Sequence, residues 1–380
     1  MREGTMKDMN VLFQSVRIQN VTVPNRFVRS ATVDNGGDNG YVSRNQLKLF
    51  ADLAKGCVGL IITGMTAVHQ SDYIRPSQNH LSDDRYIPAY KELTRLVHEK
   101  GVKIAIQLAH LGRERGKFLE GDNLAIGPSD AEDDPHCETR KYRAMTAGEI
   151  REIIEAFGEA AGRARKANFD AVQIHGAHAF LLAQFLSPHT NHRSDEWGGN
   201  LENRLRLHKE IYKAIRKEVG NDYPVLIKLG VEDGFQGGLT FSEGKRAAGM
   251  LAETGFNALE ISQGLRGKPF EETEFRTGIS GTACEAYFRS WAAEVKKVVA
   301  VPVMMVGGIR TPELMADMIE KNEADFVSLC RPFIREPDIV NVWQKGDSRP
   351  PKCISCNKCI ETLKNGEFLH CPQNKMKAAT

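Results

Sequence analysis

Eight short apolar runs recur along this chain of 380 residues, and longer segments with the apolar spacing of helices separate them. Most of the runs are apolar on consecutive residues, which is typical of parallel strands buried on both faces. An alternation of strand and helix repeated eight times predicts a (β/α)8 TIM barrel, with its active site where the strands end. The predicted strands are 27–31, 58–63, 103–108, 171–175, 225–229, 258–262, 303–306 and 326–329.

Helical segments fill most of the intervals between these runs. Thr146 and Glu149 have the spacing of a capping box at the start of one helix. A doubly wound sheet is the alternative fold, but it would require a G-x-G-x-x-G turn after its first strand, and the sequence has none. The predicted helices are 44–55, 87–100, 146–168, 202–219, 242–253, 285–299 and 312–321.

Two further segments flank the predicted barrel. Residues 12–25 have the pattern of a short antiparallel hairpin, which we expect at the lower mouth of the barrel. At the other end, the helical pattern gives way to R-P-P-K-C-I-S-C-N-K-C. We therefore expect a barrel domain over residues 1–345 and a cysteine-rich segment over residues 346–380.

The composition favours a protein that acts on small molecules. Hydrophobic residues make up 41% of the chain and charged residues 26%, as in a globular protein with ample apolar surface to bury. A formal charge of +2 argues against nucleic acid or an anionic membrane as the main partner. There is no apolar run of about eighteen residues and no signal-peptide pattern, so we expect a cytoplasmic protein.

Polar residues and glycines gather where the predicted strands end. Burial of polar groups is costly unless they find partners, so a polar ring at the mouth of a barrel favours a bound ligand. The set comprises residues 30–33, Gly64, Met65, Gln107, His110, His175, His178, Lys228, Ser262, Gly307, Gly308, Cys330 and Arg331.

The last two predicted strands end in V-G-G-I-R and L-C-R-P-F. The loops after strands seven and eight of such barrels often hold a phosphate through backbone N–H groups. Gly307 and Gly308 would allow close approach of the backbone, and Arg331 would supply positive charge. A tight turn followed by a surface arginine is the alternative, but the combination favours phosphate.

His175 and His178 lie at the end of the fourth predicted strand, three residues apart. Two imidazole donors side by side can bind an oxygen that becomes negatively charged during a reaction. Zinc is the competing ligand for H-x-x-H, but no third ligand has suitable spacing nearby. A buried structural histidine is the other alternative, and it suits a single histidine better than a pair.

Gln107 and Lys228 end two further strands with an amide and a cation. An isoalloxazine ring suits both groups, because its pyrimidine edge forms hydrogen bonds and its N1 region gains negative charge on reduction. An ion pair of Lys228 with Glu260 or Glu232 inside the barrel is the alternative for the lysine.

These residues lie in segments that resemble the Old Yellow Enzyme family over nearly the whole chain. The most specific is Q-I-H-G-A-H-A-F-L-L-A-Q-F-L-S-P-H-T-N-H-R-S-D-E-W-G-G-N-L-E-N-R, and P-N-R-F-V-R-S-A, I-A-I-Q-L-A-H, M-M-V-G-G-I-R and L-C-R-P-F-I-R-E-P support it. The resemblance implies a barrel that binds FMN and reduces the C=C bond of α,β-unsaturated carbonyl compounds with NAD(P)H. Relatives in this family often form homodimers, so the resemblance also implies a homo-oligomer.

The resemblance assigns roles by position. His175 and His178 would bind the substrate oxygen, and ten other residues at the strand ends would bind FMN. Two departures are the phenylalanine at position 180, where many members carry a proton-donating tyrosine, and Val33, where relatives carry threonine or cysteine. Tyr287 and Tyr73 are the candidate substitutes as proton donor. The implied FMN residues are Ser30, Ala31, Thr32, Met65, Gln107, Lys228, Gly307, Gly308, Cys330 and Arg331.

Four of the eight cysteines lie in the tail, at Cys353, Cys356, Cys359 and Cys371. Four thiolates suit either tetrahedral zinc or an iron-sulfur cluster, and free thiols are the remaining alternative. Three close ligands and one distant, proline-followed cysteine favour iron-sulfur, and the pattern resembles the [4Fe–4S] site of 2,4-dienoyl-CoA reductase and trimethylamine dehydrogenase. In those relatives a further FAD and dinucleotide domain exchanges electrons with the cluster.

The sequence leaves the electron donor and the reaction open. Either a partner subunit supplies electrons through the cluster, or NAD(P)H reduces FMN directly and the cluster is structural. The first functional hypothesis is an NAD(P)H-driven ene-reductase. The second is a dehydrogenase of amines or dienyl thioesters that passes electrons through the cluster to a partner, and a metal-binding or interaction subunit without catalysis is the third.

Overall fold

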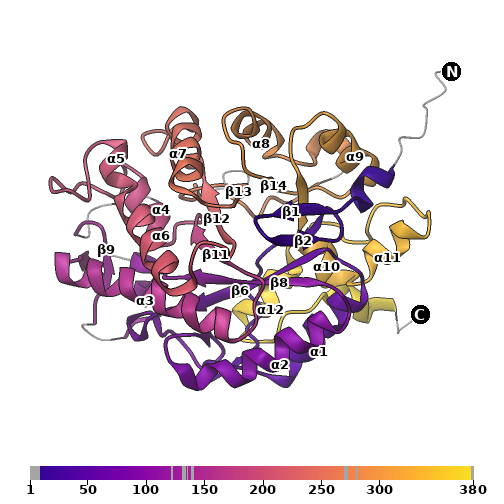
Figure 1. Cartoon of the computed structure of the whole chain (residues 1–380), viewed down its shortest axis with the longest axis horizontal. Helices are drawn as coiled ribbons and strands as arrows, with labels where there is room; N and C mark the ends of the chain where they lie inside the picture. The colour runs from indigo at the N-terminus through magenta and orange to yellow at the C-terminus, as the bar shows by residue number, and fades with distance from the viewer. Residues whose placement is uncertain are drawn as a thin grey trace.

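The protein forms a closed barrel of eight parallel strands (Figure 1). The computed structural model describes residues 9–377 except 121–122, 131–133, 135, 138–140, 269–272 and 280. All eight predicted strands are confirmed, and β15 closes the ring by pairing with β3. The barrel strands are β3 (Phe27–Arg29), β6 (Leu60–Ala67), β8 (Lys103–Ala109), β11 (Ala171–Gly176), β12 (Val225–Gly230), β13 (Ala258–Ser262), β14 (Val303–Val306) and β15 (Phe326–Leu329).

Helices surround the barrel, mostly where their apolar spacing predicts them. Thr146 and Glu149 form the predicted capping box ahead of α3. The helices are α1 (Arg44–Lys55), α2 (Ile87–His98), α3 (Ala147–Lys166), α4 (Leu181–Leu186), α5 (Leu201–Arg204), α6 (Arg206–Val219), α7 (Phe241–Thr254), α8 (Arg289–Lys296), α9 (Pro312–Glu320), α10 (Arg331–Arg335), α11 (Ile339–Gln344) and α12 (Lys358–Lys364).

Two of the predicted helices differ from the observed ones. The helix predicted over 285–299 begins only at Arg289, because Ala286 is left-handed (φ 52°) and the Glu285 carboxylate accepts hydrogen bonds from the backbone N–H groups of Arg310 and Thr311. The segment 202–219 is divided at Leu205 into α5 and α6.

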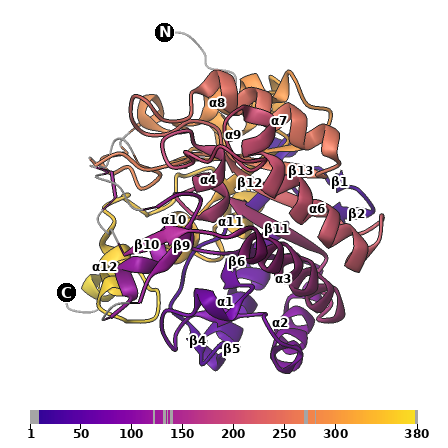
Figure 2. The ribbon, with the colours of Figure 1, turned by 90° about the vertical axis from the view of Figure 1, so that its left-hand side faces the viewer.

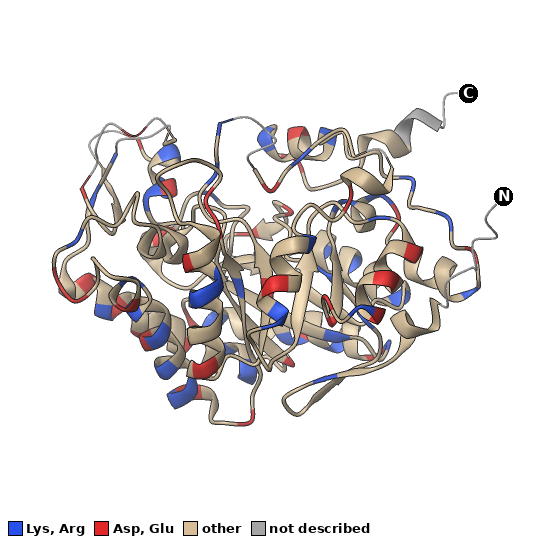
Figure 3. Cartoon of the chain, turned by 90° about the horizontal axis from the view of Figure 1, so that it is seen from above, with Lys and Arg blue, Asp and Glu red and all other residues tan. Residues whose placement is uncertain are grey.

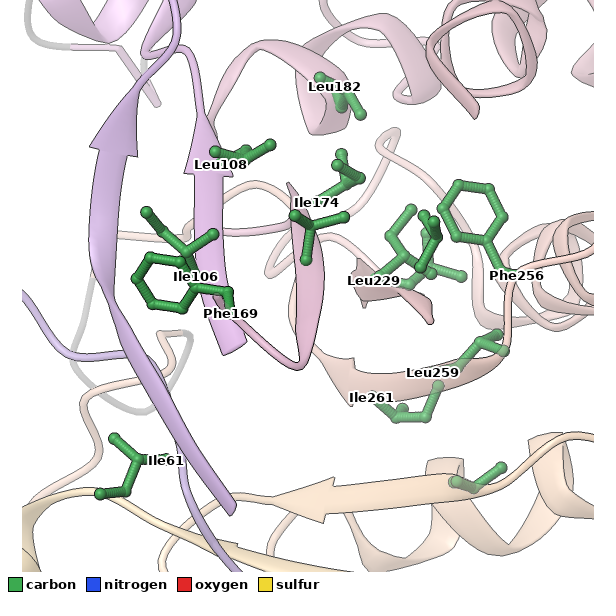
Figure 4. Packing of buried hydrophobic residues seen from close by; sticks show 14 of the residues in the cluster. Ile61, Ile106, Leu108, Phe169, Ile174, Leu182, Leu229, Phe256, Leu259 and Ile261 are labelled. Carbon is green, nitrogen blue, oxygen red and sulfur yellow. The ribbon is translucent and has the colours of Figure 1, made fainter. Parts of the chain in front are cut away.

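Side chains alternate between two apolar layers along each strand, as the period of a β-strand requires. Ile61, Ile106 and Ile174 point outward toward the helices, together with Leu229 and Ile261 (Figure 4). The intervening residues face the barrel axis. The inner layer includes Val28, Leu60, Ile62, Ala105, Ala171, Leu226, Ala258, Met304 and Phe326. Burial on both faces explains why the strands read as continuous apolar runs.

The N-terminal hairpin closes the lower end of the barrel. Strands β1 (Val16–Ile18) and β2 (Val21–Val23) pair antiparallel, as predicted. Ile18 and Val23 belong to the inner apolar layer, so the hairpin covers the end of the barrel interior. Figure 2 shows the hairpin and α12 on opposite sides of the barrel. The other end, where the strands terminate, is therefore the open one.

Short and irregular elements complete the fold. They include a bulge in β6 between Ile62 and Met65, near Gly64, whose Cβ would lie 2.6 Å from the carbonyl oxygen of Thr32. The short elements are β4 (Gly37–Asp38), β5 (Tyr41–Val42), β7 (Asn79–His80), β9 (Ala125–Gly127), β10 (Tyr142–Ala144) and the 3-10 segments η1 (Met9–Phe13), η2 (Gln70–Asp72), η3 (Asp84–Tyr86), η4 (Gly112–Phe118), η6 (Thr282–Cys284) and η7 (Pro372–Lys377).

The C-terminal segment packs against the loop that follows β3. The backbone N–H of Leu369 donates to the carbonyl of Asp34 at 2.9 Å, and the Asn35 side chain donates to the carbonyl of Leu363 at 2.9 Å. Acidic and basic residues are interspersed along the outer helices (Figure 3). Among the helices in the described residues, none combines the length and the apolar character needed to span a bilayer.

Candidate active site

A cavity of about 450 Å³ opens at the C-terminal ends of the barrel strands. This volume is within the range of small-molecule and cofactor sites. Each of the eight strands, or the loop that follows it, contributes to the lining. The cavity brings together every residue that the sequence predicts for the substrate and FMN: Ser30, Ala31, Thr32, Met65, Gln107, His175, His178, Lys228, Gly307, Gly308, Cys330 and Arg331.

A buried chain of polar side chains forms the floor of this cavity. Gln107 donates to Gln173 at 2.8 Å, and Gln173 donates to the Glu260 carboxylate at 2.9 Å. Nζ of Lys228 lies 3.3 Å from the same carboxylate and donates to the Ser30 hydroxyl at 2.8 Å. These contacts fix the amide of Gln107 and the cation of Lys228 at the base of the cavity.

The ion-pair interpretation of Lys228 is confirmed, and its contact with a flavin ring stays a prediction. Lys228 pairs with Glu260, whose side chain is 0% exposed, and it also lines the cavity. Glu232, the other candidate partner, is not its ion-pair partner in the described part of the chain. Breaking a buried ion pair is strongly destabilising, so the lysine has a structural role whether or not a ligand is bound.

His175 and His178 face each other in the cavity with ring centroids 5.1 Å apart and ring planes at 87°. His175 is the last residue but one of β11, and His178 lies in the following turn with φ 58°. That turn is held by the backbone N–H of His178, which donates to the carbonyl of Gln263 at 3.0 Å. Nε2 of His178 also lies 2.8 Å from the Ser262 hydroxyl, so the ring orientation is fixed.

Both histidines are neutral at ordinary pH. Burial lowers the pKa of each well below 6.5, and the positive charges of Lys228 and Arg266 add to the effect. Nδ1 of His175 is buried with no hydrogen-bond partner in the described residues. A neutral imidazole can donate one hydrogen bond, so the pair can offer N–H groups to an oxygen in the cavity.

Phe180 occupies the position of the missing tyrosine and lines the cavity. Its ring centroid lies 4.3 Å from that of His175. Of the two substitutes, Tyr287 lines the cavity, and its hydroxyl donates to the carbonyl of Glu274 at 2.8 Å. Burial raises the pKa of Tyr287 to about 12. Tyr73 is 41% exposed and is not part of the lining.

The loops after β14 and β15 form one end of the cavity. Gly307 (φ 127°) and Gly308 (φ 73°) are both left-handed, and a Cβ on Gly308 would lie 2.6 Å from the Tyr287 ring. Only glycine fits this turn without strain. Cys330, where many members of the resembling family have glycine, has φ −122°, outside the left-handed region that favours glycine.

Two arginines lie at this end. Arg331 donates to the carbonyl of Arg276 at 2.8 Å and to the Asn357 side chain at 2.6 Å. Arg310, which the sequence reasoning missed, lines the cavity with its Nε buried and unpartnered among the described residues. The Ser328 hydroxyl is likewise buried without a hydrogen-bond partner among the described residues. Buried polar atoms without protein partners are what a bound phosphate or polar ring would satisfy, so the residues fit FMN.

Sequence reasoning also missed the loop residues that surround the outer part of the cavity. Arg266 and Glu274 form an ion pair with 2.6 Å between nitrogen and oxygen, and Glu274 lies 3.8 Å from Nδ1 of His178. Phe275, Phe118 and Arg75 complete this part of the lining. None of these five residues follows directly on a strand, so their position in the sequence carried no signal.

The four tail cysteines line a second, small cavity of about 20 Å³. Cys353 is buried and Cys356 is exposed. In the described residues no group of three or more His, Cys, Asp or Glu side chains has the arrangement of a metal site. The spacing nevertheless brings Cys353, Cys356, Cys359 and Cys371 to one place, and Cys359 lines both cavities.

Comparison with known proteins agrees with this geometry. An "NADH oxidase" of Thermoanaerobacter brockii is 36% identical over 91% of this chain and 52% of its own length. A "Cinnamate reductase" of Clostridium sporogenes is 32% identical over 97% of this chain and 58% of its own length. The chain thus spans little more than half the length of these relatives.

A solved complex of 2-naphthoyl-CoA reductase with 2-naphthoyl-CoA superposes with a TM-score of 0.86 at 28% identity, covering 96% of this chain and 57% of that one. The sequence model of the NADH:flavin oxidoreductase / NADH oxidase family matches residues 11–349. That match includes the strand ends, the two histidines and the glycine turn. The chain belongs to the NADH:flavin oxidoreductase / NADH oxidase family.

Proposed function

We propose that this protein is an FMN-dependent oxidoreductase that uses NAD(P)H to reduce an activated C=C bond. The observation that supports this most is the meeting of His175 and His178 with Gln107 and Lys228 in one cavity. A neutral donor pair suits the oxygen of an enone or enoyl thioester, and the amide and cation suit a flavin ring. The family description and the name of the relative cinnamate reductase agree with this reaction.

Bound FMN would supply the hydride chemistry, and the chain's own residues have separate tasks. We propose that the ring lies against Gln107 and Lys228, beside Ser30, Ala31, Thr32 and Met65. The phosphate would lie against Gly307, Gly308, Cys330 and Arg331. His175 and His178 would donate to the substrate oxygen, which gains negative charge as the alkene is reduced. Donors fixed in advance stabilise that charge without the cost of reorganisation.

Anaerobic turnover tests the proposal. The FMN-loaded protein is mixed with NADH or NADPH and an enone, and the loss of the alkene is followed. We expect one of the two nicotinamides to drive complete reduction of the enone. Protein that retains FMN but reduces no enone with either nicotinamide would contradict the proposal.

Dehydrogenation of an amine or a dienyl thioester is the second candidate reaction. The observation that favours it is the small cavity lined by all four tail cysteines next to the main one, with Cys359 and Arg331 common to both. We propose that Cys353, Cys356, Cys359 and Cys371 bind a [4Fe–4S] cluster, and that residues 346–380 form a segment distinct from the barrel over 1–345. Turnover of an amine with an artificial electron acceptor, and none of an enone with NAD(P)H, would favour this candidate.

The remaining proposals concern partners and location. We propose a cytoplasmic homo-oligomer that binds a small-molecule substrate and neither nucleic acid nor a membrane. For the second candidate reaction, an electron-transfer partner would accept the electrons from the cluster.

Replacing Phe180 by tyrosine tests the source of the proton. Phe180 packs against His175 in the cavity, so a tyrosine hydroxyl at this position would extend into it. If proton delivery limits the reaction, F180Y should accelerate alkene reduction by roughly a hundred- to a thousandfold, within the usual range of general acid catalysis. Stopped-flow oxidation of the reduced flavin by an enone measures the rate. F185Y, which alters a buried phenylalanine of α4, is the matched control. No acceleration in F180Y would mean that another group already delivers the proton.

A further inference from the structure

The cavity carries far more positive than negative charge. Five cationic side chains line it, whereas Glu274 is the single carboxylate in the described lining. Two of the cations are neutralised: Lys228 pairs with Glu260, and Arg266 pairs with Glu274. The guanidinium groups of the other three, Arg75, Arg310 and Arg331, form no ion pair in the part of the chain that the structure describes. Their combined charge points to anionic ligands.

One anion does not account for all three arginines. Arg310 and Arg331 belong to the loops after β14 and β15, beside the glycine turn proposed to hold a phosphate. Arg75 comes from a different loop, between η2 and β7. There it also borders a small hollow that Val33 and Met65 line, next to the proposed position of the flavin ring. A phosphate bound beside Arg310 and Arg331 therefore does not account for the positive charge of Arg75.

The guanidinium of Arg75 is poorly satisfied by the protein. Among the described residues the guanidinium contacts the Phe118 ring, whose centroid lies 5.7 Å from Cζ. Within the described residues it forms neither an ion pair nor a side-chain hydrogen bond. Burial without a compensating charge lowers the pKa of Arg75, yet arginine remains protonated in proteins. A partly desolvated cation costs free energy unless an anion binds to it.

From this geometry we propose that Arg75 binds a carboxylate on the substrate and that Phe118 packs against its carbon skeleton. The substrates would then be α,β-unsaturated carbonyl compounds that also carry an acid group. His175 and His178 would bind the carbonyl oxygen, and Arg75 would bind the carboxylate. The inference rests on the proposed function, because it specifies the substrate class of the same cavity. An arginine suits this task since its planar group can form two parallel hydrogen bonds to a carboxylate.

Paired ligands that share a carbon skeleton and differ in charge test this inference. The probes are 4-oxopent-2-enoate and its methyl ester as substrates, and their saturated counterparts as ligands that cannot be reduced. Binding to the oxidised, FMN-loaded protein is read from the perturbation of the flavin spectrum. In R75Q we expect the Kd of the acids to rise roughly 10- to 100-fold, as for loss of a hydrogen bond between charged groups, with the esters unchanged. R75K should retain part of the affinity.

A matched control separates Arg75 from general attraction by positive charge. Arg115 lies on η4, donates to the carbonyl of Tyr73 at 3.1 Å, and is not among the cavity residues. We expect R115Q to bind acids and esters as the wild type does. A wild-type protein that binds the acid no more tightly than the ester, or an R75Q variant that loses both equally, would overturn the inference.

Two other experimental results would have a different meaning. If R75Q instead slows reduction of the flavin by NAD(P)H and leaves acid binding intact, Arg75 binds the coenzyme phosphates and the inference is wrong. If the wild type binds the acid through Arg75 but reduces neither acid nor ester, the proposed reaction fails while the assignment of Arg75 stands. The binding measurement therefore tests the role of Arg75, and the turnover measurement separately tests the proposed reaction.

Discussion

Alkene reduction is expected to fall by about a thousandfold when His175 and His178 are both replaced by leucine. Loss of one preorganised donor to a developing oxyanion typically costs about 10²–10³ in rate. The two rings are the donors that the cavity places side by side, and leucine keeps their approximate bulk. Single-turnover oxidation of the reduced flavin by an enone isolates the step, and FMN content measured on the same sample shows that the cavity is intact.

Asparagine variants provide the matched control for this prediction. An asparagine amide can donate a hydrogen bond and leucine cannot, so H178N should retain much more activity than H178L. If the leucine and asparagine variants are equally slow, donation to the substrate oxygen is not the task of His178. If H175L/H178L reduces enones at the wild-type rate, the assignment of both residues is wrong.

The same histidines give a prediction for pH. Their pKa values lie well below 6.5, so neither ring is protonated between about pH 6.5 and 8.5. The rate of alkene reduction should therefore show no histidine titration in that range. If the reaction instead required a protonated imidazolium, the rate would fall as the pH rises through about 6.5, and the assignment of neutral rings would be wrong.

Replacing Lys228 by methionine is expected to destabilise the flavin-free protein by about 3–5 kcal/mol, the usual cost of leaving a buried charge without its partner. Glu260 is 0% exposed, and its carboxylate contacts Lys228 and Gln173. In K228M/E260Q the uncompensated charge is removed, while the amide of residue 260 can still accept from Gln173. The double variant should recover most of the lost stability in urea denaturation. A K228M variant as stable as the wild type would contradict the structural role of the ion pair.

The double variant also separates the structural role of Lys228 from its role toward the flavin. A cation near the ring favours the reduced, negatively charged flavin. In K228M/E260Q we expect the two-electron potential of bound FMN to shift negative by about 30 mV or more, equivalent to ~1.4 kcal/mol. An unchanged potential and unchanged FMN affinity would mean that Lys228 serves only to balance Glu260.

The inner part of the site could be predicted from the sequence because parallel strands fix it. Residues that end a strand of a closed barrel must lie at one rim, so Gln107, His175 and Lys228 were predictable without knowledge of the loops. The buried partner of Lys228 was one of two candidates, Glu260 on the neighbouring strand β13 and Glu232 just after β12. Register decided between them, since Lys228 is directly opposite Glu260.

The outer part of the site could not be predicted in the same way. Arg75, Phe118 and Arg266 lie in loops with no periodic pattern, and their positions depend on long-range packing. The start of helix α8 could not be predicted from the local sequence either. The apolar spacing predicted its body, but the contacts of Glu285 with a distant loop determined where it begins.

The visible spectrum of the protein purified without air, together with its FMN and iron content, tests the central claim most directly. We expect flavin bands from one FMN per chain, with a broad shoulder from four iron atoms that bleaches on reduction. A flavin spectrum without iron would contradict the cluster alone. A colourless protein that takes up no FMN when it is supplied would contradict the assignment of the main cavity, and with it the proposed reaction.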